Sequence, residues 1–197
     1  MASRISQPKV AKKKQRKNTV TTMRLVTSSK KLRKNWNTAR QVKILDSFAY
    51  PRNKQIAIKA LSTGNPVMRK GKKLGTPRYL TSITYSAVDL VDARDRKHAI
   101  PIMPKNAKRG TKPLYMKSIL KRQNPIECRC TCPDFYFVWG WALKRRGALL
   151  GSHMVPYVRK TPLPPVGYPR RNPRHILGYC KHIKALIESL NARGIIK

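Results

Sequence analysis

The sequence predicts an α+β fold in which a strand-rich middle region precedes a small domain rich in cysteine and histidine, with long, basic, irregular extensions. Three observations support this class. Apolar residues alternate in the middle of the chain, an apolar stripe of helical period lies near the end, and lysine and arginine fill the extensions. A chain of 197 residues can bury one sizeable core with extensions, and two full domains are not expected.

The charge of the chain is strongly one-sided. It holds 45 Lys and Arg against 7 Asp and Glu, which gives +38 at pH 7. No fold needs this excess, and it predicts binding to a polyanion with an affinity that falls as salt rises. Nucleic acid is the expected partner, and an anionic membrane surface is the alternative. No apolar run approaches the roughly 20 residues of a membrane-spanning helix, so no transmembrane helix is expected, and the expected partner is nucleic acid and no membrane.

Residues 1–40 form a basic N-terminal arm without a single acidic residue. Charges of one sign repel, so we expect the arm to lack regular structure on its own and to act separately from the cysteine-containing part. The arm has no apolar core of a secretory signal; a phosphate-binding tail or a nuclear signal suits it better than an organellar transit peptide. Its expected phosphate contacts are Lys12, Lys13, Lys14, Arg16, Lys17, Lys30, Lys31, Arg33 and Lys34.

Residues 41–76 mix apolar spacings without a clean period, and Pro51 interrupts them. The pattern predicts two short elements over residues 41–62. The segment that follows is rich in Gly, Pro and Lys, and it predicts a basic loop.

Residues 77–125 are predicted to be rich in strands. β-Branched and aromatic residues alternate in "YLTSITYSAV", residues 79–88, which predicts a strand. Residues 98–103 predict another strand, and residues 124–132 a third that continues into the next region. Between these two, residues 106–122 predict a basic loop followed by a short strand or helix.

Two segments show the apolar period of a helix. In residues 183–190 the apolar positions are i, i+3, i+4 and i+7, and the helix is expected to close at Gly194. Residues 134–150 carry a second stripe, which predicts a helix that packs against the cysteine region, with Phe137 and Trp141 on another face. Aromatic residues near basic ones can stack on bases, although core packing is their more frequent use. The expected basic contacts here are Lys144, Arg145 and Arg146.

Three of the four cysteines, Cys128, Cys130 and Cys132, lie at alternate positions. On a strand such residues face the same side. In a straight strand Cys128 and Cys132 are about 13 Å apart, too far to share a metal, whereas neighbouring members about 6.6 Å apart can be brought together by a bend. Pro133 supplies a bend, so Cys130 and Cys132 are the better pair.

Two further ligands are expected from Cys180 and His182, at the start of the helix over residues 183–190. Together the two pairs make a closed, tetrahedral four-ligand set for Zn²⁺. A disulfide framework suits short secreted chains with a signal peptide, and buried inert thiols rarely occur in this pattern. His175 is the reserve ligand, because it lies five residues before Cys180.

The sequence "CTCPDF", followed at a distance by "CKHI", resembles the SWIM zinc finger, whose pattern is C-x-C, a variable spacer and C-x-H. The resemblance implies that Cys130, Cys132, Cys180 and His182 hold Zn²⁺ and that Cys128 is surplus. It also implies a zinc-stabilised ββα-like unit, which binds nucleic acid or protein without a reaction of its own. The long spacer is similar to that of small SWIM-domain proteins of tailed phages and large DNA viruses.

This domain is expected over residues 126–197, with a Pro/Arg-rich insertion over residues 151–179. The prolines of the insertion force an extended path with little regular structure. Arg170 and Arg171 are expected to reach phosphates or a neighbouring subunit.

The sequence contains no nucleotide-binding glycine loop, no nucleophile elbow and no group of carboxylates that would indicate an enzyme or a small-molecule substrate. Glu127 and Asp134 flank the cysteines, but Glu127 is expected to balance neighbouring arginines and Asp134 to cap a helix.

The expected function is therefore that of a non-enzymatic, zinc-stabilised, nucleic-acid-binding structural protein. We expect a minor virion component that contacts packaged DNA and capsid proteins; otherwise the protein is cytoplasmic or nuclear, and it is not secreted. A ribosomal or ribosome-associated RNA-binding protein is the first alternative, and a regulatory or recombination factor that uses the SWIM unit for protein or DNA contacts is the second. DNA is favoured, although phosphate attraction by itself carries no base information.

Overall fold

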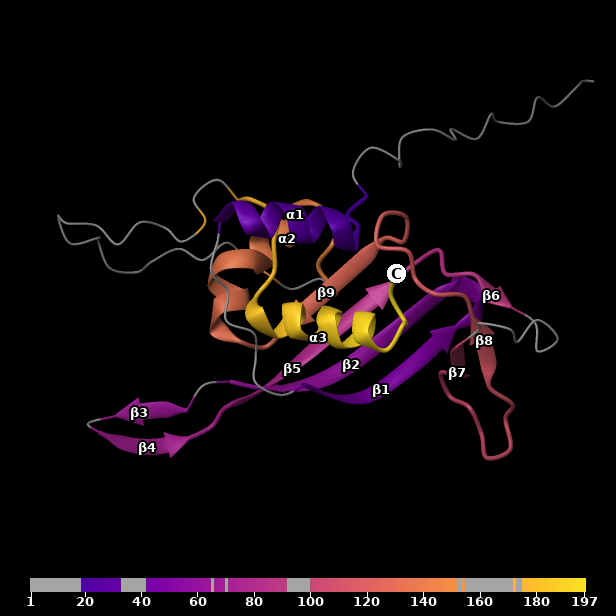
Figure 1. The fold of residues 1–197 in the computed structure, drawn as a ribbon, viewed down its shortest axis with the longest axis horizontal. Coiled ribbons are helices and arrows are strands. Elements are labelled where there is room, and N and C mark those ends of the chain that lie inside the picture. The colour runs from indigo at the N-terminus through magenta and orange to yellow at the C-terminus, as the bar shows by residue number, and fades with distance from the viewer. Residues whose placement is uncertain are drawn as a thin grey trace, which may run out of the picture.

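The computed structural model describes residues 19–32, 42–64, 66–69, 71–91, 100–151, 154, 172 and 175–197, with side chains left out at positions 29–32, 68, 69 and 73. Within these ranges the fold is a mixed α/β structure built on a seven-stranded sheet, in the order β6-β8-β7-β1-β2-β5-β9 (Figure 1). No described helix is long and apolar enough to cross a membrane.

The centre of the sheet is an antiparallel array of four strands. These are β1 (Val42–Tyr50), β2 (Gln55–Thr63), β5 (Arg78–Tyr85) and β9 (Ile126–Cys130). A 3₁₀ turn over Pro51–Asn53 joins β1 to β2 and ends at Lys54, which has a positive φ of 49°. The two elements predicted on either side of Pro51 are thus one hairpin. The strand predicted over residues 79–88 is confirmed as β5 as far as Tyr85, where the strand ends.

A β-bulge explains why the apolar spacing of β1 has no clean period. The register of β1 against β2 shifts between Ile44 and Asp46. Ile44 pairs with Ala60, and Ala49 pairs with Ile56, so all four side chains share one face. Five residues separate Ile44 from Ala49, and a regular strand would send them to opposite faces. The extra residue restores both to the core side.

The predicted basic loop after β2 is wrong for most of its length. Strands β3 (Val67–Arg69) and β4 (Lys72–Gly75) form an antiparallel ribbon. It continues the β2–β5 hairpin outward, beyond a hydrogen bond of 2.8 Å from the Gly64 amide to the Pro77 carbonyl (Figure 1). Gly71, with a φ of 76°, turns the chain between the two strands. The glycine and lysine content of the segment indicated a loop. Gly71 instead forms the turn of the hairpin between β3 and β4.

The other edge of the sheet consists of β7 (Ile100–Pro104), β8 (Leu114–Met116) and β6 (Leu90–Val91). Strand β7 pairs with β1 in parallel, and β8 joins β7 to β6 with antiparallel pairing. The strands predicted near residues 98–103 and 124–132 are confirmed as β7 and β9. The undecided element within residues 106–122 is the strand β8.

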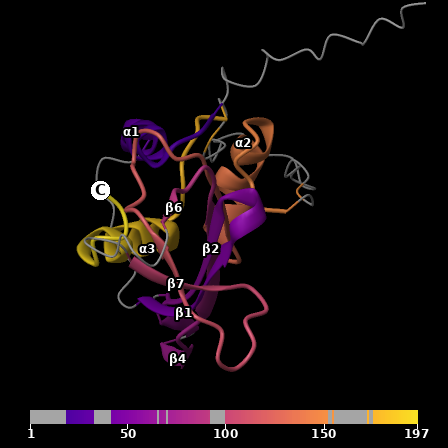
Figure 2. The same ribbon diagram turned by 90° about the vertical axis from the view of Figure 1, so that its right-hand side faces the viewer.

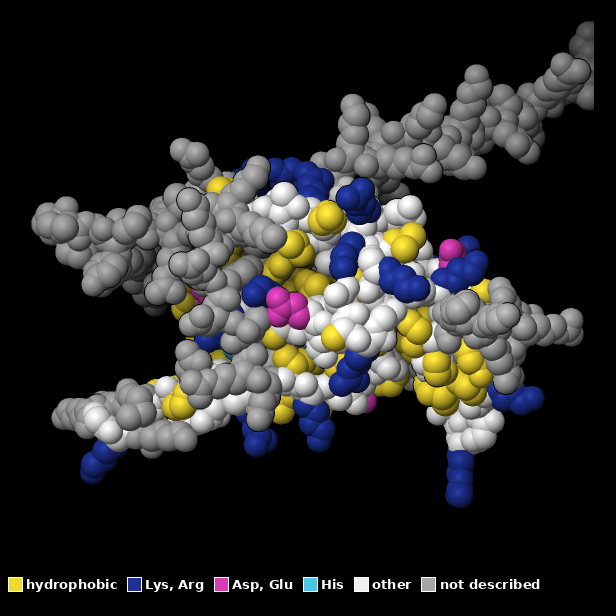
Figure 3. Space-filling model, in the orientation of Figure 1, with side chains coloured by type: hydrophobic (Ala, Val, Ile, Leu, Met, Phe, Trp, Pro, Cys, Tyr) yellow, Lys and Arg dark blue, Asp and Glu magenta, His cyan; other side chains and the backbone are white. Residues whose placement is uncertain are grey.

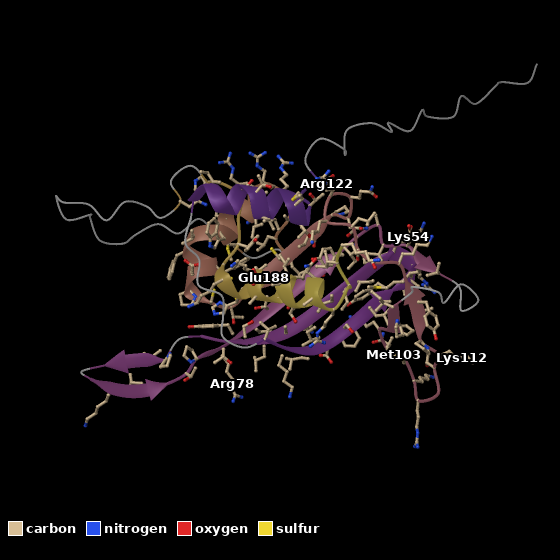
Figure 4. The ribbon with its side chains drawn as sticks, viewed as in Figure 1. Lys54, Arg78, Met103, Lys112, Arg122 and Glu188 are labelled. Atoms are coloured by element: carbon tan, nitrogen blue, oxygen red, sulfur yellow. The ribbon has the colours of Figure 1, made fainter. Side chains whose placement is uncertain are left out.

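Helix α3 (Lys181–Ala192) lies across one face of the central strands, and α1 lies on the same side of the sheet (Figures 1 and 2). The apolar stripe predicted for α3 is confirmed, and Gly194 follows α3 with a φ of 70°. The opposite face of the sheet carries exposed side chains such as Lys59 and Leu80, and Arg78 projects away from α3 (Figure 4). The buried stripe of α3 is Ile183, Leu186, Ile187 and Leu190.

The expectation that the basic arm lacks regular structure is wrong for residues 19–32. Helix α1 (Thr22–Leu32) forms there, and Val20 and Leu25 are buried in the core. The Ile126 amide donates a hydrogen bond of 2.9 Å to the Val20 carbonyl, and Thr22 Oγ1 lies 3.5 Å from the Tyr85 hydroxyl. Apolar burial on one side of α1 therefore outweighs the repulsion that the lysines and arginines imply. The rest of the predicted arm lies outside the described residues.

The helix predicted over residues 134–150 is confirmed as far as Arg145, with one change of geometry, and residues 146–150 are not helical. Residues Phe135–Trp139 form a wider π-helical turn, η3, which continues into α2 (Gly140–Arg145). The predicted stripe is buried: Phe135, Val138, Trp139, Ala142 and Leu143.

Both described ends of the insertion are fixed to this helix. Asn172 Nδ2 donates to the Val138 carbonyl at 3.1 Å, and Met154 packs so closely on Gly140 that a side-chain Cβ there would collide with its sulfur. The insertion between them lies outside the described residues.

Replacing Ile83 with alanine should lower the free energy of unfolding by about 2–5 kcal/mol, because the side chain is fully buried under α3. The matched control is Leu80→Ala on the same strand but the opposite face, where the side chain is 39% exposed and the expected change is about 0.5 kcal/mol or less. Urea denaturation measures both. Equal losses for the two variants would contradict the one-sided core.

Candidate metal centre

Four side chains meet where the last central strand ends and α3 begins. Each of Cys130, Cys132, Cys180 and His182 offers one donor atom, and these atoms lie within 4.8 Å of one another. All four residues are buried, and none of the thiols forms a disulfide. The structure thus brings the four residues predicted from the sequence within metal-binding distance.

The sheet positions the first two thiols. Cys130 ends β9 and pairs with Thr81 of β5, whose hydroxyl donates to its sulfur at 3.6 Å. Thr131 prolongs this pairing, because its amide donates to the Leu80 carbonyl at 3.0 Å and its hydroxyl accepts from the Leu80 amide at 3.0 Å. The chain then turns into the helix, and the Phe135 amide donates to Cys132 Sγ at 3.3 Å. This turn brings Cys132 back beside Cys130, as the bend at Pro133 predicted.

The start of α3 supplies the other two donors. Cys180 is the N-cap residue in an extended conformation, and His182 lies in the first turn. The Nδ1 atom of His182 lies 3.8 Å from Cys130 Sγ, and the ring of Tyr79 packs on the imidazole with 4.6 Å between centroids.

The imidazole of His182 has one nitrogen turned to the thiols and one turned away from them. Nε2 is buried and has no hydrogen-bond partner among the described residues, a condition that it shares with Ser62 Oγ. Ser62 pairs with Tyr79 across β2 and β5, and the Tyr79 ring packs on the imidazole of His182. Both of these polar atoms therefore belong to neighbours of Tyr79. Since Nδ1 faces the sulfur atoms, it is the nitrogen that is placed to bind an ion.

The pKa values of the three thiols in the cluster are shifted in different directions. Hydrogen bonds from the Cys132 and Cys180 thiols hold the pKa of Cys130 far below its ordinary value. The pKa of Cys132 is raised to about 12, chiefly because its thiol donates to Cys130. Burial, followed by the hydrogen bonds to the other two cysteines, raises the pKa of Cys180 well above its usual range. Within the cluster, Cys130 is therefore the thiol most easily deprotonated, and Cys132 and Cys180 hold their protons more tightly.

Cys128 is separated from this cluster by the register of the sheet. It pairs with Ile83, its amide donates to the Ala148 carbonyl at 2.9 Å, and burial raises the pKa of its thiol. It faces the same side as Cys130 but packs in the apolar core. The reserve ligand His175 is likewise not part of the cluster of four.

The two acidic residues beside the cysteines have different surroundings. Glu127 alternates with Cys128 on β9 and so faces the opposite side of the sheet, away from the thiols. Asp134 stands at the N-cap position of η3 without a side-chain capping hydrogen bond. Instead, its carboxylate accepts from the Trp139 indole at 3.3 Å. The predicted capping role of Asp134 is therefore wrong.

The residues predicted to contact nucleic acid have different positions. Lys144, Arg145 and Arg146 are exposed at the end of α2, and Lys30 and Lys31 belong to α1. The sequence pattern did not single out Tyr136, which is also exposed. The other predicted contacts lie outside the described residues: Lys12, Lys13, Lys14, Arg16, Lys17, Arg33, Lys34, Arg170 and Arg171.

Comparison of the chain with protein-family models, with curated proteins and with solved structures finds no match. The site is therefore interpreted from its own geometry and donor chemistry.

Replacing Cys180 with serine should release the metal, because it removes one of four converging donors. Cys128→Ala is the matched control, because it removes a buried thiol of β9 outside the set of four donors, and this variant should retain one metal ion per chain. Elemental analysis of purified protein measures both. Metal retained in Cys180→Ser and lost in Cys128→Ala would overturn the assignment.

Metal uptake should release about two protons at pH 7–8, because ligands bind as thiolates and the pKa values of Cys132 and Cys180 are raised. Apparent affinity should consequently rise with pH, by about a hundredfold per unit in this window. Calorimetric titration in buffers of different ionisation enthalpy counts the protons. Binding without proton release would contradict the assigned protonation of the cluster.

Proposed function

We propose that the chain is a zinc-stabilised, nucleic-acid-binding structural protein. Two features of the described residues support it: a closed set of four metal donors and an excess of exposed cations. The first concerns how the protein is held together, and the second concerns what it binds.

Zinc is the ion that suits the donor set. Three thiols and one imidazole match a structural Cys₃His site, and thiolate ligands select zinc over the hard cations Mg²⁺ and Ca²⁺. In a tetrahedral site with sulfur at about 2.3 Å and nitrogen at about 2.0 Å from the ion, two sulfurs lie about 3.8 Å apart, and a sulfur and a nitrogen lie about 3.5 Å apart. The 3.8 Å between Cys130 Sγ and His182 Nδ1 is within about 0.3 Å of the distance between sulfur and nitrogen in such a site.

The role proposed for the ion is structural. Four protein donors fill a tetrahedral site and leave no position for water or a substrate, whereas catalytic zinc keeps one position open. Bound zinc would tie the end of β9 to the start of α3, and it supplies no reaction. We therefore propose that the protein is not an enzyme.

The observation that carries the nucleic-acid part is the charge of +38, with 45 basic and 7 acidic residues. On the face seen in Figure 3, several lysine and arginine side chains are exposed and acidic ones are few. Lys184 and Glu188 form an ion pair of 3.3 Å along α3, but most cations have no carboxylate within the chain to neutralise them. Phosphates of a nucleic acid supply the missing negative charge.

The order of the ligands supports a SWIM-type assignment. A C-x-C pair ends a strand and a C-x-H pair begins a helix, as in the pattern that the sequence resembles. The proposals that follow from the resemblance are a place in a large nucleoprotein assembly, with a virion favoured, and contacts with other proteins of that assembly.

Deleting residues 1–17 should flatten the slope of log affinity against log salt for duplex DNA. The deletion removes seven Lys and Arg, and each phosphate contact contributes about 0.9 to the slope, so the change should be as large as about six. It ends before residue 19 because Val20 and Leu25 belong to the core. Fluorescence anisotropy at several salt concentrations gives the slopes.

The matched control deletes residues 1–8, which contain only Arg4 as a basic residue. Its slope should change by about one at most. A full-length chain that binds neither DNA nor RNA at low salt would contradict the proposed function, and an unchanged slope in the longer deletion would assign the arm to protein contacts.

A further inference from the structure

We propose that the outer side of the η3–α2 helix binds unpaired nucleic-acid bases. We name it the stacking face, and it consists of Tyr136, Phe137, Trp141, Lys144 and Arg145. The inference rests on the proposed function and adds to it the class of ligand: a single strand, or an unpaired stretch, whose bases are free to stack on aromatic rings.

The buried residues of the helix lie on its inner side, and Tyr136 and Phe137 of the stacking face are exposed on its outer side. Phe135, Val138 and Trp139 are buried against the core. Tyr136 and Phe137 stand between them in the sequence, and their side chains are 43% and 50% exposed. Much of each ring is therefore open to a ligand, while the neighbouring residues fill the core. Large exposed apolar groups side by side are typical of a binding surface.

The two rings have a fixed relation to each other. The centroids of Tyr136 and Phe137 lie 5.2 Å apart, with the rings at 88° in an edge-to-face contact. Such a contact is favourable in itself and restricts both side chains. Restricted side chains lose less conformational freedom on binding, so the pair is prepared to receive a planar ligand. Every nucleic-acid base offers a planar π-face.

Positive charge adjoins the rings. Lys144 Nζ lies 5.3 Å above the ring of Trp141 and is held there by a hydrogen bond of 2.7 Å to the Met154 carbonyl. Arg145 is exposed beside it at the end of α2. The sequence from residue 135 to residue 187 contains no Asp or Glu, so no carboxylate of this long segment competes for these cations. The face therefore offers aromatic rings for bases and cations for the connecting phosphates.

A single strand fits these features better than a duplex or a protein. Duplex bases are stacked on one another and present only their edges in the grooves, so the rings would have no base plane to contact. Single-stranded segments present bases that can be splayed out onto aromatic side chains. A protein partner would use the rings, but the clustered cations beside them require a partner of regular negative charge.

The test uses the full chain with Tyr136 and Phe137 both replaced by alanine. Anisotropy of a labelled oligonucleotide of mixed sequence, at constant salt, should show single-strand affinity reduced by about tenfold to a hundredfold. Affinity for the matching duplex should change by less than about threefold, since the charges remain. Metal content and the unfolding midpoint verify that the variant is folded.

Two further variants make the comparison specific. Tyr136→Phe combined with Phe137→Tyr retains both rings and should retain single-strand affinity. Leu120→Ala removes another apolar side chain, 40% exposed and located elsewhere, and should leave both affinities unchanged.

An unchanged single-strand affinity in the folded double-alanine variant would overturn the stacking face and assign the rings to a protein contact. Equal losses for single strand and duplex would also overturn it. In both cases salt-dependent binding by the full chain would leave the proposed function intact. A full chain that binds no nucleic acid would remove both proposals together.

Discussion

The junction between the end of β9 and the start of α3 is the constraint on which the rest of the fold depends. Helix α3 covers the central strands, and its first turn is placed by Cys180 and His182 beside Cys130 and Cys132. Its far end is held by the backbone, because the Ile119 amide donates to the Ile195 carbonyl and the Lys197 amide donates to the Ile119 carbonyl, both at 2.8 Å. With both ends fixed, the apolar stripe of α3 is directed at the sheet.

Burial of the same junction without a bound ion costs free energy of folding. Three thiols and an imidazole are buried together, and hydrogen bonds from the neighbouring thiols favour the thiolate form of Cys130. A buried charge opposes folding, and so does an imidazole nitrogen that has no hydrogen-bond partner in the described part of the chain. A bound cation would neutralise this charge and convert metal affinity into stability, which is how small metal-containing folds usually gain cooperativity.

Electrostatic repulsion and apolar burial have opposite effects on the stability of the fold. Repulsion among lysines and arginines disfavours a compact state, while the core that they surround is apolar and continuous. Helix α1 shows the balance in one element: Leu25 is buried, Arg24 beside it is exposed, and a single apolar side is enough to dock the segment. A polyanionic partner would relieve the repulsion without disturbing the core. The proposed function thus also bears on stability.

The sequence by itself determined the features that depend on neighbours along the chain. The stripe of α3 and the alternation of β5 follow from local periodicity, and the ligand pairs follow from the chemistry and spacing of Cys130, Cys132, Cys180 and His182. The tertiary structure alone decided what depends on pairing between distant segments. The bulge in β1 has meaning only against β2, α1 forms where Val20 meets Ile126, and Cys128 is a core residue because β9 places it opposite Ile83. Such contacts leave no period in the sequence, because the free energy that selects them is gained only when both partners are already in place.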